Sequence, residues 1–549
     1  MQQLRKYRDA GVISDGDIAA ARLLVDITVR NGGLPPEILG WLLLCLTLRT
    51  QRDSHTCVDL SRIIDWRADI DLDEPSHLDW PVAPSDWLAA ATASPTIFGD
   101  PGSTAPLIVD DQRVYLARSY AEESAIATAL TRNNADHLSI ILGGPGTGKT
   151  TTVAKRLIER LSEGGEHLNI ALVAPTGKAA ARMRDVLLAR CREIGASESV
   201  MQEVNSAQSS TVHSLLGFAP SRTPRYKFGP QNQLPFDWVV VDEASMMSAS
   251  LMYRLLEALH PNTELLLVGD PSQLESVDAG SILTDIASVA LREGSILHSR
   301  TREMKGQHRF PKGSDIEKFA DAVRVGDTAN AMKVLDGQLE FISWIDPTTA
   351  VGKTELRKLE QETVAHASKI VDEVNKGNSS AALKFRLEFQ ILCAHRSGQY
   401  GVSHWNDLVE RNLGPSAENR WYIGRPVMVT RNNSSLKLSN GDIGIVLKDQ
   451  DGHPAVAFGD EHEIRLLSTT RLEDVQTVHA LTIHKSQGSE FAHAVVIMPN
   501  ESSRILTREL LYTGVTRAKS KLTIVGSRKV IESSISRSIR RATGLANRL

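Results

Sequence analysis

Cysteine is scarce in this sequence, and the few cysteines are far apart. The four of them, at positions 45, 57, 191 and 393 of 549 residues, form no CxxC pair. Neither a disulfide framework nor a cysteine-based zinc site is expected from this spacing. An excess of positive charge is also lacking, because the net charge is −4. Bulk charge therefore neither supports nor excludes a nucleic-acid partner, and any such binding has to use local patches.

Long hydrophobic runs are missing as well. The most apolar early stretch, residues 38–48, is shorter than the ~20 residues that a membrane-spanning helix needs. We therefore interpret it as a core helix. The N-terminus, MQQLRKYRD, lacks the apolar core of a signal peptide. The sequence thus predicts a soluble chain with reduced thiols in the cytoplasm.

The length and the apolar patterning predict several domains. Residues 1–116 show mainly helical spacing without a catalytic constellation, so we expect a helical docking domain there. From residue 117 onward, short apolar runs alternate with helical patterns, which indicates a parallel sheet flanked by helices. These runs are residues 138–142, 170–174, 238–241 and 264–268.

A second set of helical and apolar runs follows residue 306, with strand patterns at 389–393, 494–498 and 522–525. Between them lies a stretch rich in Gly, Asn and Asp with strand-like alternation. We therefore predict an α/β fold with two lobes, and a basic C-terminal segment, 537–549, that forms a solvated helix. The predicted lobes are residues 117–305 and 306–549, and the second carries a small strand-rich insertion at about 418–475.

Residues 143–150, Gly-Gly-Pro-Gly-Thr-Gly-Lys-Thr, have the phosphate-binding spacing G-x-x-x-x-G-K-[ST] between a predicted strand and a predicted helix. Glycines let backbone N–H groups turn toward phosphate oxygens, and the helix N-terminus adds its positive end. Lys149 is expected to reach the β- and γ-phosphates of ATP, and the Thr150 hydroxyl to bind Mg²⁺. The expected ATP-binding residues are Gly143, Gly144, Pro145, Gly146, Thr147, Gly148, Lys149, Thr150 and Thr151.

Two adjacent carboxylates, Asp242 and Glu243, follow the apolar run of residues 239–241. At the end of a buried strand, the first carboxylate is suited to hold Mg²⁺ together with Thr150. The second is suited to orient or deprotonate the attacking water. The spacing therefore predicts an ATP-hydrolysing site.

Further segments resemble, in chain order, the motifs of superfamily 1 helicases. Residues 174–180, APTGKAA, resemble motif Ia, and TVHSLL at 211–216 resembles another DNA-side motif. GDPSQL resembles the third motif, HRF the fourth, TIHKSQGSEF the fifth and YTGVTRA the sixth. These last four occupy residues 269–274, 308–310, 482–491 and 512–518.

A narrower resemblance is to the RecD family, the alpha subunits of exodeoxyribonuclease V (RecBCD). HTCVDL at 55–60, LCAHRSG at 392–398 and NGDIG at 440–444 carry it. The resemblance extends over most of the chain and is strongest from 138 to 526. It implies two RecA-like P-loop NTPase lobes with ATP between them, Gly488 and Glu490 near the nucleotide, and arginines reaching across from the second lobe. The catalytic set that it implies is Lys149, Asp242, Glu243, Gln273, Arg309 and Arg517.

The same resemblance implies contacts with DNA. Small polar groups and a lysine suit sequence-independent contacts with phosphates and sugars. For His213 a satisfied core histidine stays an alternative, and for Lys178 a solvated helix residue. The implied DNA-binding residues are Pro175, Thr176, Lys178, His213, Asn432, Thr482 and His484.

The chain departs from the helicase pattern at two places. Glu275 follows Leu274 where the third motif usually continues with proline. The segment before the P-loop is short. Family members have a glutamine there that reads adenine, whereas residues 132–137 of this chain contain none.

The resemblance implies an ATP-dependent DNA helicase that translocates 5′ to 3′ on single-stranded DNA within a helicase–nuclease for double-strand-break repair. ATP and Mg²⁺ are the implied cofactors, and the beta and gamma subunits of exodeoxyribonuclease V (RecB and RecC type) are the implied partners. The alternative is a non-catalytic or assembly-dependent scaffold of the same complex, which predicts the loss of charge-handling residues. A GTPase switch would need an Asn-Lys-x-Asp guanine reader, which the sequence lacks.

Overall fold

The computed structural model describes most of the chain. Within that part, no helix is both long enough and apolar enough to cross a membrane. The described residues are 2–64, 78, 80–132, 137–164, 168–219, 225–306, 310, 313–337, 339–414, 419–433, 435–459, 464–501 and 503–549.

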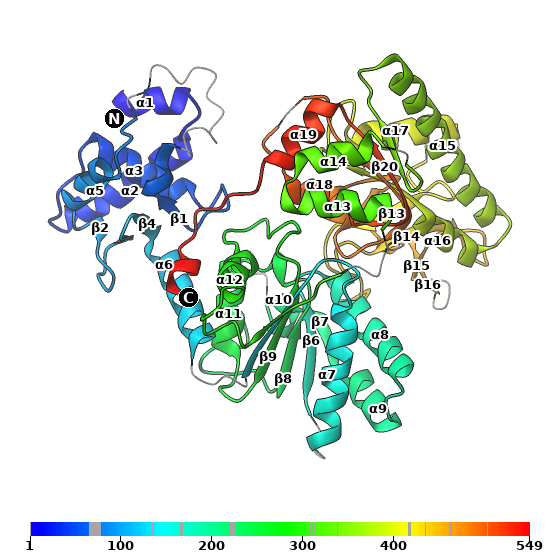
Figure 1. Ribbon diagram of the computed structural model, residues 1–549, viewed down its shortest axis with the longest axis horizontal. Coiled ribbons are helices and arrows are strands. Elements are labelled where there is room, and N and C mark those ends of the chain that lie inside the picture. Colours follow the sequence, from blue (N-terminus) through cyan, green and yellow to red (C-terminus); the bar gives the residue numbers. More distant parts are fainter. Residues whose placement is uncertain are drawn as a thin grey trace.

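The N-terminal domain combines helices with a small sheet (Figure 1, blue). The apolar run at its centre forms α3 (Ile38–Arg49), which is buried over most of its length and organises the core of this domain. The sheet, in the order β1-β4-β3-β2, was not apparent from the sequence, because its strands are too short to show alternation. The other elements are α1 (Gln2–Asp9), α2 (Asp15–Arg30), α5 (Pro84–Thr92), β1 (Cys57–Asp59), β2 (Phe98–Gly99), β3 (Leu107–Asp110) and β4 (Arg113–Leu116).

The first lobe is a parallel sheet in the order β10-β5-β9-β8-β6-β7. Its strands are β5 (Leu138–Leu142), β6 (Ile170–Ala174), β7 (Gln208–Thr211), β8 (Trp238–Val241), β9 (Glu264–Gly269) and β10 (Thr301–Glu303).

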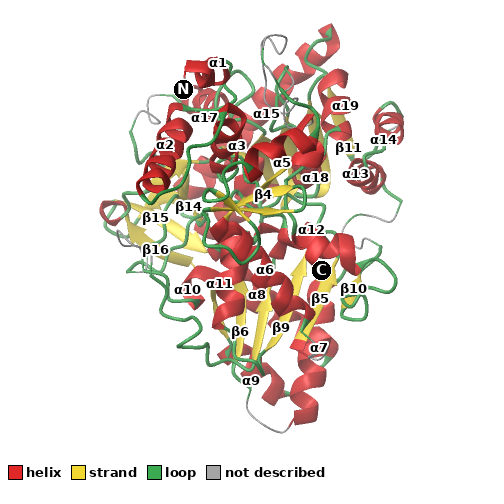
Figure 2. Ribbon diagram, turned by 90° about the vertical axis from the view of Figure 1, so that its left-hand side faces the viewer, coloured by secondary structure: helices red, strands yellow, loops and turns green. Residues whose placement is uncertain are grey.

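Helices cover both faces of this sheet, as an α/β fold requires when its central strands are apolar throughout (Figure 2). On one face lie α7 (Lys149–Gly164), α8 (Gly177–Ile194) and α9 (Glu198–Ser206). The other face is covered by α6 (Ala117–Thr131), α10 (Val212–Leu215), α11 (Ala249–Ala258) and α12 (Ile282–Ala290).

The second lobe is also a parallel sheet, in the order β11-β20-β19-β12-β18. The predicted two-lobed α/β class is thereby confirmed. Its strands are β11 (Ile342–Ile345), β12 (Phe389–Cys393), β18 (Ala480–Thr482), β19 (Phe491–Ile497) and β20 (Ala518–Val525). Its helices are α13 (Asp315–Val325), α14 (Thr328–Leu335), α15 (Ala350–Asn375), α16 (Ser379–Glu388), α17 (Val402–Leu413), α18 (Arg508–Val515) and α19 (Arg528–Ser536).

Between α17 and β18 the chain forms a small antiparallel sheet in the order β16-β15-β14-β13-β17. This sheet is the strand-rich insertion that the composition predicts. Its strands are β13 (Pro426–Val429), β14 (Ile443–Lys448), β15 (Pro454–Gly459), β16 (Ile464–Ser468) and β17 (Val475–Thr477).

The C-terminal segment is not the solvated helix that its basic composition predicts. It leaves α19 in extended form, crosses to the first lobe and the N-terminal domain, and ends in the short helix α20 (Leu545–Arg548) (Figure 1, red). Leu545 is fully buried, and Arg541 and Arg548 form ion pairs with carboxylates. The prediction failed because composition alone does not show that acidic partners from distant segments neutralise these arginines.

Candidate ATP-binding cleft and nucleic-acid groove

The parallel register of the first lobe brings the predicted catalytic motifs to one edge. The P-loop follows β5, Asp242 follows β8 and Asp270 follows β9. Because all these strands run the same way, their carboxyl ends meet where α/β sheets bind ligands.

The P-loop turns through two glycines in the left-handed region, Gly146 (φ +77°) and Gly148 (φ +86°), and ends at Lys149, the first residue of α7. The Lys149 ammonium donates to the carbonyls of Gly143 at 2.6 Å and Gly144 at 2.9 Å. The loop thus curls around a positive charge, in the place where phosphate oxygens are expected to replace the carbonyls.

Asp242 and Glu243 lie beside this loop. Burial and the neighbouring Glu243 raise the pKa of the Asp242 carboxyl, and the Lys149 charge partly opposes the shift. The Glu243 backbone is in the left-handed region, at φ +51°, and its N–H donates to Asp242 Oδ1 over 2.9 Å. Such strain in a non-glycine residue is typical of functional sites. The hydroxyl of Thr150 and the carboxylate of Asp242 are hard oxygen donors, which fits Mg²⁺.

Arg517 reaches this cleft from the second lobe. It is only 3% exposed, and its Nη2 donates to Gln273 Oε1 over 3.0 Å. Gln273 is held in turn by Asp270, whose Oδ2 accepts from Gln273 Nε2 over 3.2 Å. Arg517 Nη1 also donates to the Ser489 carbonyl, at 3.2 Å.

One cavity of about 150 Å³ is lined by residues of both lobes, including Lys149 and Arg517. Thr147, Gly148 and Thr151 line a separate groove on the other side of the P-loop, of about 1340 Å³. Arg309 lies outside the described residues. The predicted residues that line the cavity are Pro145, Gly146, Lys149, Thr150, Asp242, Glu243, Gln273, Gly488, Glu490 and Arg517.

Arg182 on α8 also lines this cavity, and sequence reasoning missed it. Its guanidinium pairs with Glu490 at 2.9 Å and donates to the Gly488 carbonyl at 3.2 Å. No local signal marks this arginine, since its partners lie about three hundred residues away and belong to the other lobe.

A second cavity, of about 690 Å³, also lies between the lobes and is bordered by the insertion. We call it the interlobe groove. Asn432 does not line the groove. Its side-chain Oδ1 accepts a hydrogen bond from the N–H of Asn440, and Asn440 does line the groove. The predicted DNA-binding residues that line the groove are Pro175, Thr176, Lys178, His213, Thr482 and His484.

Lys178 connects the groove with the nucleotide cleft. Its ammonium donates to the hydroxyl of Ser489 over 2.6 Å, and the carbonyl of the same serine accepts from Arg517. Burial lowers the pKa of Lys178 to about 7. Lys178 is therefore not a freely solvated helix residue. His213 is exposed on the groove wall, which contradicts the alternative of a core histidine.

The groove also contains polar residues that were not predicted. His395 and Arg396 follow β12 directly, and Lys485 and Gln487 follow β18. Their position at the carboxyl ends of two parallel strands was the available signal. Helicase motif positions alone do not point to these four residues as DNA contacts.

Comparison with known proteins identifies the family. Residues 9–115 match the N-terminal domain of the RecBCD enzyme subunit RecD, residues 122–279 an AAA domain, and residues 477–525 a UvrD-like helicase C-terminal domain. The RecBCD enzyme subunit RecD of Mycolicibacterium smegmatis is 39% identical over 585 residues, covering 98% of each chain. The chain belongs to the RecD family.

A second RecD relative, the RecBCD enzyme subunit from Haemophilus influenzae, is 33% identical over 78% of this chain and 72% of its own length. Among solved structures, Bacteroides Pif1 bound to single-stranded DNA matches with a TM-score of 0.40. That match has 16% identity and covers 75% of this chain and 93% of the Pif1 chain. The RecD family assignment rests on the sequence relatives.

Proposed function

We propose that this RecD-family chain is an ATP-dependent DNA helicase that translocates on single-stranded DNA as a subunit of a RecBCD-type complex. Its partners are chains of the RecB and RecC type, because the similar proteins carry the name RecBCD enzyme subunit RecD. Residues 117–305 and 306–549 form its two motor lobes. The chain translocates 5′ to 3′ along the DNA strand. Because it acts on cellular DNA, it works in the cytoplasm. The observation that carries the proposal is that Lys149 and Arg517, from different lobes, line one cavity.

The residues of the cleft divide the work of phosphoryl transfer. Bound ATP with Mg²⁺ supplies the phosphoanhydride bond whose hydrolysis drives the cycle. Lys149 binds the phosphates, and Thr150 and Asp242 hold the metal ion. Glu243 orients the attacking water. Arg517 adds positive charge from the opposite lobe, so hydrolysis depends on closure of the lobes.

Closure is also expected to change the grip on DNA. The groove takes Thr176 from the first lobe and Thr482 and His484 from the second. A change in the angle between the lobes therefore changes the spacing of these contacts along a strand. The contact of Ser489 with both Lys178 and Arg517 joins the groove to the cleft through one residue.

The scaffold alternative has less support. A subunit kept only for assembly has no need to retain charge-handling side chains, yet Lys149, Asp242, Gln273 and Arg517 converge on one cavity. We therefore propose that the chain hydrolyses ATP and is not only a scaffold.

The test is ATP hydrolysis by the purified chain with and without single-stranded DNA, beside Lys149→Ala. We expect stimulation by DNA, and loss of hydrolysis in the variant. Lys358→Ala is the control, because Lys358 is an exposed lysine of α15 that lines neither the cleft nor the groove beside the P-loop. The same comparison in complex with the partner chains separates an assembly-dependent motor from a scaffold. Equal, DNA-independent turnover by the chain and by Lys149→Ala would refute the motor.

A further inference from the structure

The C-terminal strap, residues 537–549, is bound first to the second lobe. The carbonyl of Arg537 accepts from the N–H of Arg508 over 2.8 Å. Two residues further on, the N–H of Ile539 donates to the Glu509 carboxylate over 3.0 Å. Both partners lie in the first turn of α18, the helix that leads to Arg517. The strap therefore begins on the element that positions this arginine.

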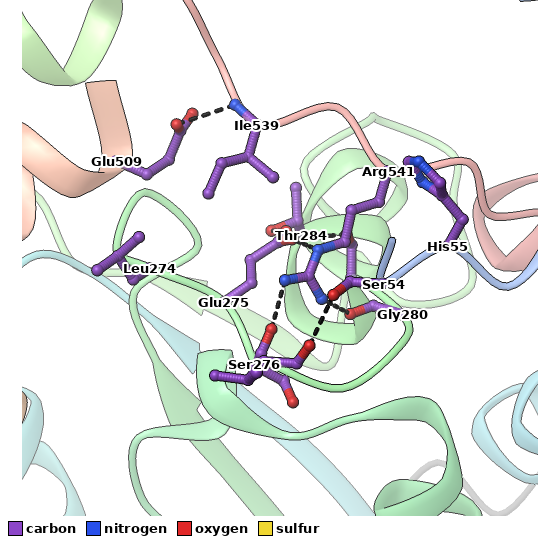
Figure 3. A network of polar contacts seen from close by, with 12 residues as sticks. Ser54, His55, Leu274, Glu275, Ser276, Gly280, Thr284, Glu509, Ile539 and Arg541 are labelled. Atoms are coloured by element: carbon purple, nitrogen blue, oxygen red, sulfur yellow. Dashed lines mark hydrogen bonds and ion pairs between the residues drawn. The ribbon is translucent and has the colours of Figure 1, made fainter. Parts of the chain in front are cut away.

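The strap next binds a loop of the first lobe, residues 274–280, which we call the third-motif loop (Figure 3). Arg541 Nε pairs with Glu275 Oε2 over 3.0 Å, and both side chains are about nine-tenths buried. Arg541 Nη1 donates to the carbonyls of Asp278 at 2.9 Å and Gly280 at 2.8 Å, and Nη2 donates to that of Ser276. One guanidinium thus binds along most of the loop.

The N-terminal domain binds both the strap and the loop. The N–H of Ala542 donates to His55 Nδ1 over 2.9 Å. The neighbouring Ser54 donates from its hydroxyl to the Val277 carbonyl over 2.6 Å, and its own carbonyl accepts from the N–H of Gly280 over 3.2 Å. Three parts of the molecule therefore meet at this loop.

The other end of the loop belongs to the nucleotide cleft. The N–H of Leu274 donates to Thr513 Oγ1 over 3.0 Å, and its carbonyl accepts from Gln487 Nε2 over 3.1 Å. Leu274 directly follows Gln273, the partner of Arg517. The loop between these ends also forms part of the wall of the interlobe groove. It therefore contacts the nucleotide cleft, the groove and the strap.

The chain between the two anchors is short. Ile539, bound to the second lobe, and Arg541, bound to the first, are two residues apart, and two extended residues span at most about 7 Å. While both bonds hold, Glu509 and Glu275 cannot move far apart. The lobes are therefore tethered at this point, and rotation about it is a motion that keeps both bonds.

We propose that Arg541 is a positioning residue for DNA-stimulated ATP hydrolysis. By holding the third-motif loop, it makes the strap the pivot between the lobes and keeps Gln273 aligned with Arg517 when DNA enters the groove. This inference rests on the proposed motor function. It also accounts for Glu275 where the motif usually has proline, since the strap supplies the cation that this carboxylate needs when buried.

A lysine cannot replace Arg541 in this role. The guanidinium donates to three carbonyls and a carboxylate at once, which uses its planar arrangement of N–H groups. A lysine would keep the charge opposite Glu275 but lose most of the carbonyl contacts. Arg541→Lys therefore separates the charge of this residue from its geometry.

The test compares Arg541→Ala and Arg541→Lys with Arg548→Ala in the full chain. Arg548 is the matched control: it is a partly buried strap arginine that pairs with Asp110 at 2.7 Å and does not touch the loop. ATP hydrolysis is measured with and without single-stranded DNA, and hydrogen–deuterium exchange is measured on peptides that cover the loop.

We expect Arg541→Ala to lower the DNA-stimulated rate roughly ten- to hundredfold, as misplacement remote from the chemistry does, with little change in the DNA-free rate. The DNA-stimulated rate of Arg541→Lys is expected to lie between those of the unmodified chain and Arg541→Ala. Exchange in residues 274–280 should rise in both variants and stay unchanged in Arg548→Ala.

Unchanged stimulation in Arg541→Ala, or an equal fall of both rates in Arg541→Ala and Arg548→Ala, would overturn the inference. The inference would also be overturned if an Arg541 variant lost activity while hydrogen–deuterium exchange in residues 274–280 stayed unchanged. Absence of DNA stimulation in the unmodified chain and its complex would instead refute the proposed motor, so the two failures are distinguishable.

Discussion

Arg517 donates a hydrogen bond to Gln273 over 3.0 Å, across the boundary between the two lobes. Asp270 orients the glutamine from behind through its own hydrogen bond. The pair thus joins a third-motif side chain of one lobe to a cation of the other. Groups held in this way need little reorganisation when charge develops on the transferring phosphate.

Replacement of Arg517 is expected to abolish turnover without abolishing ATP binding. Arginines that act across such an interface contribute about 10³–10⁵ in kcat. Arg517→Lys should not restore activity, because an ammonium lacks the fork that also contacts Ser489. Single-turnover hydrolysis and nucleotide titration measure the two effects. Lys521→Ala serves as control, because Lys521 is an exposed lysine of β20 that does not line the cleft. An unchanged kcat in Arg517→Ala would contradict the assignment.

Gly177→Ala tests the approach of the insertion to the first lobe. A Cβ at Gly177 would lie 2.2 Å from Ser439 Cβ, so the insertion has to shift away from the first lobe. We therefore expect weaker binding of single-stranded DNA, because Asn440 and Gly441 beside Ser439 line the groove, together with a fall in thermal stability. Fluorescence anisotropy and thermal unfolding measure these. Ser439→Gly in the same chain should restore the affinity, and failure of this rescue would count against a steric cause.

Lys178 predicts a pH dependence of DNA binding. Burial lowers its pKa to about 7, so the ammonium is charged below this pH and loses its charge above it. Affinity for single-stranded DNA should therefore fall as the pH rises from 6 to about 8. Anisotropy titrations at both pH values test this. In Lys178→Met the extra pH dependence should disappear, and the same slope in both proteins would exclude Lys178 as its source.

Three histidines of the second lobe predict acid sensitivity. Burial lowers the pKa of His366 to about 4, of His479 to about 3 and of His493 to about 4. The unfolded chain takes up protons first as the pH falls below about 6.5, so the free energy of unfolding decreases from there toward pH 4.

Each of these histidines contributes about 1.4 kcal/mol per pH unit within that window. Urea unfolding at pH 7 and pH 5 should show the loss, and His479→Gln should reduce it by the share of one histidine. A chain equally stable at both pH values would refute this account.

Local sequence patterns were sufficient to predict the geometry of the P-loop. A P-loop needs a strand, glycines, a lysine and a helix start within a few residues, and the structure has each of them at 138–164. The central strands of both lobes were also predictable, because buried parallel strands are continuous apolar runs. The polar edge strands β7 and β10 were not, since they lack such a run. Contacts such as Arg182 with Glu490 were not, since their partners lie in different lobes.

The sequence by itself determined the two-lobed α/β class, the strand, loop and helix of the P-loop unit, and the family, because each depends on residues that are neighbours in the chain. Only the tertiary structure decided which side chains meet across the cleft and what becomes of the C-terminal segment. Arginines in a basic segment can be exposed to solvent or can pair with buried carboxylates. The choice depends on whether folding brings Glu275 within reach of Arg541, which no local pattern records.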